Sequence, residues 1–155
     1  MPVQTPRLIT LALFAAVFVT LVSCEKPTPV EYAQACSEAN DQKLIQTSGY
    51  LTDGGSLFCS NTRDNSTVEC GFQLLAKIGD KNALKVDIAV GNGANSVEKI
   101  ERGYKPSDLK IHDHAGALIN FSKPVTITAR ARAWHDPTSK EKLNCYFTVK
   151  KLEQM

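Results

Sequence analysis

The chain has 155 residues, of which 43% are hydrophobic and 22% are charged, so it is long enough for one domain with a core and too short for two. Its 18 basic and 16 acidic residues leave a formal net charge of +2. Proteins that bind nucleic acid through phosphate contacts carry a larger positive excess. The composition therefore predicts a single domain and argues against a nucleic-acid partner.

The first 23 residues have the pattern of an export signal. Arg7 is the only charged residue before Cys24, and residues 8–21 form a predominantly apolar run that is shorter than the roughly 20 residues of a bilayer-spanning helix. The segment Leu21-Val22-Ser23-Cys24 that follows resembles the lipobox of bacterial lipoproteins, in which the cysteine is lipidated and becomes the new N-terminus. An ordinary signal peptide, or an uncleaved anchor with an incidental cysteine, is the alternative.

The resemblance implies that Cys24 anchors the protein to a membrane, because several acyl chains bind durably where one binds only marginally. Residues 24–31 contain two prolines and three charged residues and are predicted to form an extended tether that lifts the domain off the lipid headgroups. Glu25 stands where inner-membrane lipoproteins of enteric bacteria carry an aspartate. We therefore expect the periplasmic side of the outer membrane rather than the inner membrane.

The remaining cysteines predict two disulfides. Cys36, Cys59, Cys70 and Cys145 are an even number in a chain that is exported to an oxidising compartment, and they allow three pairings. The polar, turn-rich sequence between Cys59 and Cys70 favours that pair, which leaves Cys36 to meet Cys145. A metal site or a redox pair is the alternative, although no CxxC spacing supports it.

The rest of the chain is predicted to consist mainly of strands, at residues 43–52, 68–78, 83–91, 125–134 and 143–154, because hydrophobic residues alternate there. Residues 29–41 suit one or two short helical turns, and residues 79–82 form a tight turn between the second and third strands. Asn95 and Glu98 predict a capped helix that ends at Gly103. Residues 113–116 are a further turn, and residues 135–142 are a loop.

Five strands with a helical link between the third and the fourth resemble an oligonucleotide/oligosaccharide-binding (OB) fold over residues 43–154. The expected fold class is all-β, a small OB-like barrel with one or two short helices, and a small β-sandwich is the alternative. Ala129 occupies a position where many such barrels have a glycine that lets the fourth strand bend. The predicted organisation is a signal peptide over residues 1–23, a lipidated tether over 24–31 and one domain over 32–155.

Three histidines are the candidates for metal binding or catalysis. His112 and His114 are two residues apart, and His135 lies in a separate loop that can approach them. Asp113 lies in a predicted turn, which disrupts the same-side geometry, and no serine has the setting of a nucleophile. We expect that the protein is not an enzyme and that it binds neither a cofactor nor a metal ion. An envelope enzyme or metal-binding protein that uses His112, His114 and His135 is the alternative function.

The OB resemblance implies a ligand face on the second and third strands and on the flanking loops, residues 53–67 and 135–142. The residues placed there are Tyr50, Arg63, Gln73, Lys85, Asp87, Trp134 and Tyr146, with Arg130 and Arg132 pointing outward from the fourth strand. Aromatic rings stack on planar or sugar-like ligands, and arginines pair with anions. We expect a non-catalytic binding module of the cell envelope with a protein or saccharide ligand; a plain solvated face is the alternative.

Overall fold

The structure is a computed structural model that describes residues 25–155, without the side chains of residues 140 and 141. The expected signal peptide and Cys24 lie outside the described residues. The elements are β1 Thr28–Pro29, α1 Tyr32–Ala35, the 3-10 helix η1 Glu38–Asn40, β2 Leu44–Thr52, β3 Phe58–Asn61, β4 Val68–Leu75, β5 Ala83–Ala89, β6 Ser96–Val97, the 3-10 helix η2 Pro106–Asp108, β7 Ile111–His112, β8 Val125–Asp136 and β9 Ser139–Gln154.

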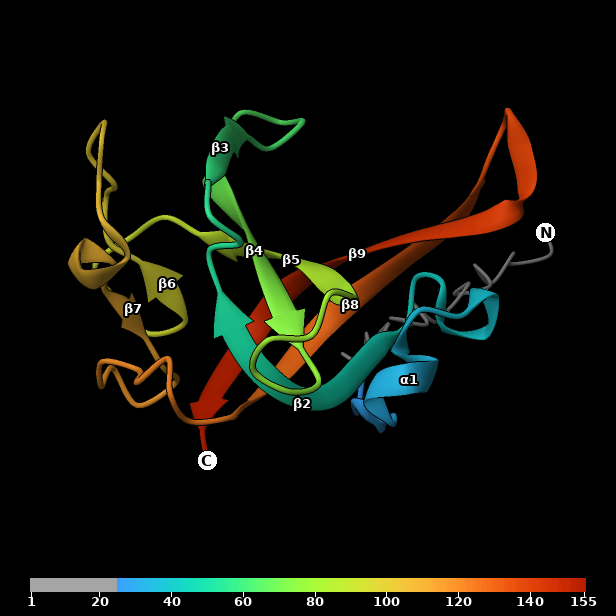
Figure 1. The fold of residues 1–155 in the computed structure, drawn as a ribbon, viewed down its shortest axis with the longest axis horizontal. Helices are drawn as coiled ribbons and strands as arrows, with labels where there is room; N and C mark the ends of the chain where they lie inside the picture. Colours follow the sequence, from blue (N-terminus) through green and yellow to red (C-terminus); the bar gives the residue numbers. More distant parts are fainter. Residues whose placement is uncertain (1–24) are drawn as a thin grey trace, which may run out of the picture.

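Five of these strands form a ring in the order β2, β8, β9, β5 and β4, and β4 pairs with β2 again (Figure 1). β5 and β9 are parallel, whereas the other neighbours in the ring are antiparallel. The β2–β4 pairing is short, from Tyr50–Leu75 to Thr52–Gln73, so the ring is only partly closed. The protein is therefore a small all-β barrel, as the OB-like pattern predicted. The β-sandwich alternative is wrong, because one sheet closes on itself.

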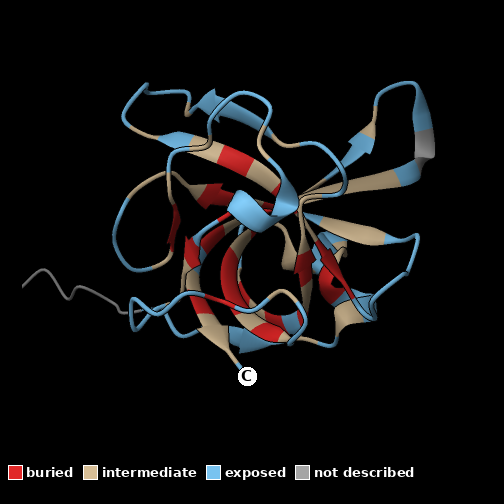
Figure 2. Cartoon of the chain, turned by 60° about the vertical axis from the view of Figure 1, so that its left-hand side comes forward, coloured by how far each residue is buried: buried red, intermediate tan, exposed pale blue. Residues whose placement is uncertain are grey.

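Alternate residues of the ring strands fill the barrel, as the period-two pattern predicted. Phe72, Val86, Ile127 and Phe147, one from each of four strands, are at most 1% exposed. In Figure 2 the buried residues follow the curved strands that surround the core. Burial of each such side chain stabilises the fold by roughly 1.5–3 kcal/mol. Residues between them on the same strands point outward.

The barrel closes although Ala129 replaces the glycine that is common in the fourth strand. Ala129 is fully buried, and the register between β8 and β9 shifts by one residue beside it. Lys150 is the additional residue on β9, which is the geometry of a β-bulge and increases the local bend of a strand. The shift also turns Leu152 into the core, where it is fully buried.

The N-terminal segment is extended, as predicted for a tether, but it is bound to the barrel. β1 pairs in parallel with the beginning of β2. The carboxylate of Glu25 forms an ion pair with Arg130 at 2.7 Å, and it also accepts a hydrogen bond from the Leu44 N–H at 3.2 Å. From Glu25 onward, therefore, this segment contacts the domain instead of extending away from it.

The two short helices α1 and η1 confirm the prediction for residues 29–41 and pack against β2 and β8 of the barrel. Ala35 of α1 is 1% exposed and belongs to the core. The Tyr32 hydroxyl donates a hydrogen bond to the Leu74 carbonyl oxygen of β4 at 2.8 Å. These contacts join the helical segment to the ring.

The connection between β5 and β8 contains no helix at residues 95–103, so that prediction is wrong. The chain forms β6 there, which pairs with β7. Asn95 has a φ of 58°, whereas an N-cap residue is extended, and its side-chain oxygen accepts a hydrogen bond from the Leu152 N–H at 2.8 Å. A long-range bond to β9 therefore replaces the predicted local cap. The turn at residues 113–116 is confirmed, because Asp113 accepts hydrogen bonds from the N–H groups of Ala115 and Ala117 at 2.9 Å.

Two hairpins differ in length from the prediction. β3 lies within the region that was predicted as a loop, and it pairs antiparallel with β4. At its tip, hydrogen bonds from Thr62 and Ser66 lower the pKa of Asp64 to about 2. The loop predicted at residues 135–142 shrinks to a tight turn between β8 and β9, in which Asp136 accepts a hydrogen bond from the Thr138 N–H at 2.8 Å.

Both predicted disulfides are present. Cys59 and Cys70 lie directly opposite each other on β3 and β4, with their Cα atoms 4.0 Å apart. Cys36 follows α1 and bonds to Cys145 of β9. The first bridge therefore fastens a hairpin, and the second joins the beginning of the domain to its last strand.

Candidate functional site

One row of outward-facing side chains crosses four strands of the barrel. Gln73 of β4 lies opposite Lys85 of β5, and Lys85 lies opposite Tyr146 of β9. Tyr146 in turn lies opposite Arg132 of β8. We call Gln73, Lys85, Tyr146 and Arg132 the outer row. Because opposite residues on neighbouring strands have Cβ atoms only about 5 Å apart, these side chains form one continuous surface.

Trp134 extends the aromatic part of the outer row. Its ring centroid is 5.6 Å from that of Tyr146, and the rings meet edge to face at 67°. Trp134 nevertheless remains 45% exposed. A notch of about 200 Å³ lies beside it, lined also by Leu84, Lys85 and Asn144. This volume is smaller than that of a typical small-molecule pocket, so the notch suits one side chain or one ring of a larger partner.

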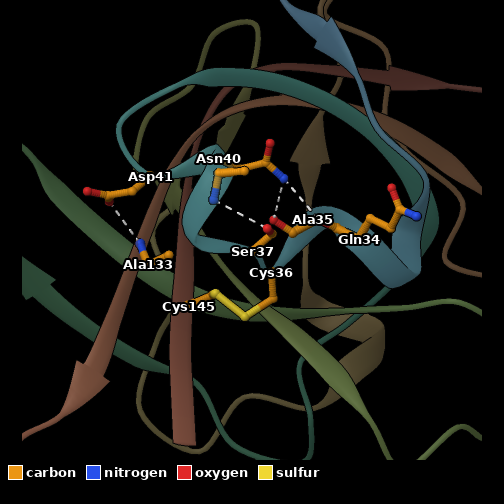
Figure 3. Close-up of a disulfide and its surroundings, with 9 residues drawn as sticks. Gln34, Ala35, Cys36, Ser37, Asn40, Asp41, Ala133 and Cys145 are labelled. Carbon is orange, nitrogen blue, oxygen red and sulfur yellow. Dashed lines mark hydrogen bonds between the residues drawn. A yellow bond between two sulfur atoms is a disulfide. The ribbon is translucent and has the colours of Figure 1, made fainter. Parts of the chain in front are cut away.

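The strands that carry the aromatic pair, β8 and β9, are each held by residues 36–41 at a position next to Trp134 or Tyr146 (Figure 3). The Cys36–Cys145 disulfide holds β9, and the Asp41 carboxylate holds β8 by accepting a hydrogen bond from the Ala133 N–H at 3.0 Å. The Asn40 amide stabilises the segment between them by donating hydrogen bonds to two carbonyl oxygens of α1, at 2.9 and 3.1 Å. The aromatic pair therefore sits on a rigid base and has little backbone freedom to lose on binding.

Asp87 makes the charge of this surface dependent on pH. It lies two residues after Lys85 on β5 and also faces outward. Burial raises the pKa of Asp87 to about 6; the Glu69 carboxylate raises it as well, and Lys85 lowers it. As the pH falls through 6, Asp87 takes up a proton and the surface around Lys85 becomes more positive.

The other residues that were predicted for the ligand face lie elsewhere. Arg130 forms an ion pair with Glu25, so its charge is balanced within the chain. Arg63 is exposed at the tip of the β3–β4 hairpin. Tyr50 lines a different cavity, which it shares with Gln73. The structure therefore brings together Lys85, Arg132, Trp134 and Tyr146, with Gln73 and Asp87 beside them.

The three histidines do not form one site. Their partners are different, with His112 contacting Glu98, His114 contacting Asn95 and His135 contacting Glu38. The hydrogen bond to Glu98, 3.0 Å long, raises the pKa of His112. Among the described residues, no group of three or more His, Cys, Asp or Glu side chains is arranged to hold a metal ion. The geometry thus gives the histidine-based alternative no support.

Known protein-family models and curated proteins include no match to this chain. In the part of the chain that the structure describes, no helix has both the length and the apolar character needed to cross a bilayer.

Sequence reasoning identified most of the outward-facing residues but missed the contacts that position them. The period-two alternation showed that Lys85 and Tyr146 point out of the barrel. It carried no signal for the Asp41–Ala133 hydrogen bond or for the capture of Arg130 by Glu25, because each pair is distant in sequence and polar residues in loops have many potential partners.

Proposed function

We propose that this chain is a membrane-anchored binding module of the bacterial cell envelope with no catalytic activity of its own. The Leu21-Val22-Ser23-Cys24 motif supports a lipid anchor at Cys24. Glu25, which stands where inner-membrane lipoproteins of enteric bacteria carry an aspartate, supports the periplasmic side of the outer membrane. Two disulfides within one small domain are typical of proteins in an oxidising compartment.

The outer row and Trp134 are the proposed binding surface. The observation that carries this proposal is the strand register that aligns the outer row across β4, β5, β9 and β8. Tyr146 and Trp134 offer ring faces and edges to a sugar ring or to an apolar side chain. Lys85 and Arg132 flank them and pair with anionic groups of the same partner. A protein or saccharide with acidic groups beside a ring or an apolar side chain fits this arrangement.

The surface is tested by crosslinking intact membranes, purifying the protein and analysing the bound material for protein and for saccharide. Arg132→Ala and Trp134→Ala are each expected to lower partner recovery by at least about tenfold, as substitutions at the centre of an interface do. Arg63→Ala and Phe58→Ala are the matched controls, because they remove an exposed arginine and an exposed aromatic ring from the β3 hairpin. Loss of the partner only in the two controls would move the binding site to that hairpin.

The anchor is tested separately with Cys24→Ser. The variant is expected to fold, to keep both disulfides and to leave the membrane fraction, because the acyl chains supply the membrane affinity. A variant that still sediments with membranes after a salt wash would contradict the lipobox interpretation without affecting the outer row.

A further inference from the structure

A second cavity, of about 600 Å³, lies where β2 and β4 close the ring. We call it the β2–β4 cavity. Its walls come from the ends of these two strands, from the turn between β4 and β5, and from the connection between β5 and β8. The apolar part of its lining includes Leu75, Ile78, Leu109 and Phe121, and its volume is typical of pockets that enclose a small organic molecule.

The charges that line the β2–β4 cavity all have one sign. Asp53 and Asp80 contribute carboxyl groups, and no lysine, arginine or histidine among the described residues lines the cavity. The Tyr104 hydroxyl and the Gly55 N–H donate hydrogen bonds to the two oxygens of Asp53, each at 3.2 Å. The Lys77 N–H donates a hydrogen bond to Asp80 at 3.1 Å. Both carboxyl groups are therefore held in position and lack a cationic side chain within the cavity.

The apolar wall is incompletely covered by the protein. Ile78 is 67% exposed at the rim, although Leu75 and Leu109, which also line the cavity, are at most 9% exposed. A ligand that fills the cavity would remove apolar surface of Ile78 from water, which contributes roughly 25 cal/mol for each Å² buried. The Tyr50 side chain and the Gln73 amide add polar groups that can orient such a ligand.

We propose that the β2–β4 cavity binds a small organic amine, with its ammonium group toward Asp53 and Asp80 and its aliphatic or aromatic body against Ile78 and Phe121. Charge complementarity selects a cation, because an anionic ligand would be repelled by two carboxylates that no cation in the lining offsets. The volume and the apolar wall select a small molecule with an apolar body. The cavity shares only Gln73 with the outer row. A failure of the amine proposal would therefore leave the proposed partner surface unaffected, and the reverse also holds.

Two probes with the same ring and opposite charge, phenethylamine and phenylacetate, test the proposal. The isotope-labelled protein is purified from membranes in detergent, in the form that the cell produces. Each probe is then titrated into it, and the backbone amide signals are recorded by nuclear magnetic resonance. Phenethylamine is expected to shift the amides of Gly54 and Gly79, which both line the cavity, in a saturable way with an affinity on the order of millimolar or tighter. Phenylacetate is expected to leave them unchanged.

Asp80→Asn is the decisive variant, because it removes one charge from an exposed turn while the amide oxygen can still accept the Lys77 hydrogen bond. It is expected to weaken phenethylamine binding by at least about tenfold. Asp136→Asn, in the β8–β9 turn, is the matched control and is expected to bind as the unchanged protein does. Equal shifts with both probes, no saturable shift with phenethylamine, or unchanged binding by Asp80→Asn would each overturn the proposal.

Discussion

Loss of the Cys36–Cys145 disulfide is expected to destabilise the barrel more than loss of the Cys59–Cys70 disulfide. The two bridges span sequence separations of 109 and 11 residues. Loop-closure entropy in the unfolded chain then corresponds to about 5 kcal/mol for the long bridge and about 3 kcal/mol for the short one. The short bridge also joins strands that already pair, whereas the long bridge joins α1 to β9.

The assay compares two double variants, Cys36→Ala with Cys145→Ala and Cys59→Ala with Cys70→Ala, by unfolding in urea. Circular dichroism follows the sheet, and fluorescence follows Trp134, the only tryptophan of the chain. A difference of about 2 kcal/mol separates the midpoints by roughly 1 M urea. The unchanged protein under reducing conditions is the control, because it loses both cross-links and keeps every sulfur atom in place.

That control separates cross-linking from packing. Cys70 is fully buried, so its replacement by alanine also removes core contacts, and the difference between this variant and the unchanged protein, both under reducing conditions and so both without cross-links, measures that loss. If the variant without Cys59 and Cys70 is the less stable of the two after this correction, the entropic reasoning fails for this barrel.

Three further predictions concern charged groups. Because the pKa of Asp87 is raised to about 6, the ionised carboxylate opposes folding at higher pH. Since solvent screens this partly exposed group, Asp87→Asn should stabilise the protein by only about 1 kcal/mol at pH 8 and by little near pH 4, as measured by urea unfolding across pH. Because the pKa of His112 is higher in the folded protein than in the unfolded chain, this histidine stabilises the fold below its unfolded pKa, and the stabilisation is lost as the pH rises through its folded pKa. Glu98→Gln should make the thermal stability depend less on pH between pH 5 and 8, a range that brackets the usual histidine pKa of about 6.5. Glu25→Ala should accelerate hydrogen exchange at the Leu44 amide, which donates to the Glu25 carboxylate, and an unchanged exchange rate would mean that the N-terminal segment is not docked in solution.

Much of the fold was predictable because it depends on local patterns. Alternation of hydrophobic residues located the five ring strands and showed that Phe72 and Phe147 point inward while Lys85 and Tyr146 point outward. The polar sequence between Cys59 and Cys70 indicated their disulfide correctly, because residues close in sequence meet in a hairpin. The helix predicted to begin at Asn95 is absent for the opposite reason. The side-chain oxygen of Asn95 accepts its hydrogen bond from Leu152, in a strand far along the chain.

The candidate site was predictable only as a set of outward-facing residues. Arg130 had the same sequence signal as Arg132, because both alternate with alanines on one strand, but Arg130 forms an ion pair with Glu25. Tyr50 was also predicted for the ligand face, but barrel closure placed it in another cavity. Nothing local to Asp53 or Asp80 marked them as neighbours of one cavity.

The sequence by itself determined the five ring strands, the direction in which their side chains point and the motif at Cys24, and it favoured the cysteine pairing that the structure has. Only the tertiary structure decided which outward-facing residues become neighbours. Strand alternation is a property of each backbone segment, whereas register, the bulge at Lys150 and the short β2–β4 seam arise when segments far apart in sequence pair and close a ring. The outer row exists only once β4, β5, β9 and β8 have paired in this register, and the β2–β4 cavity exists only once β2 and β4 have met.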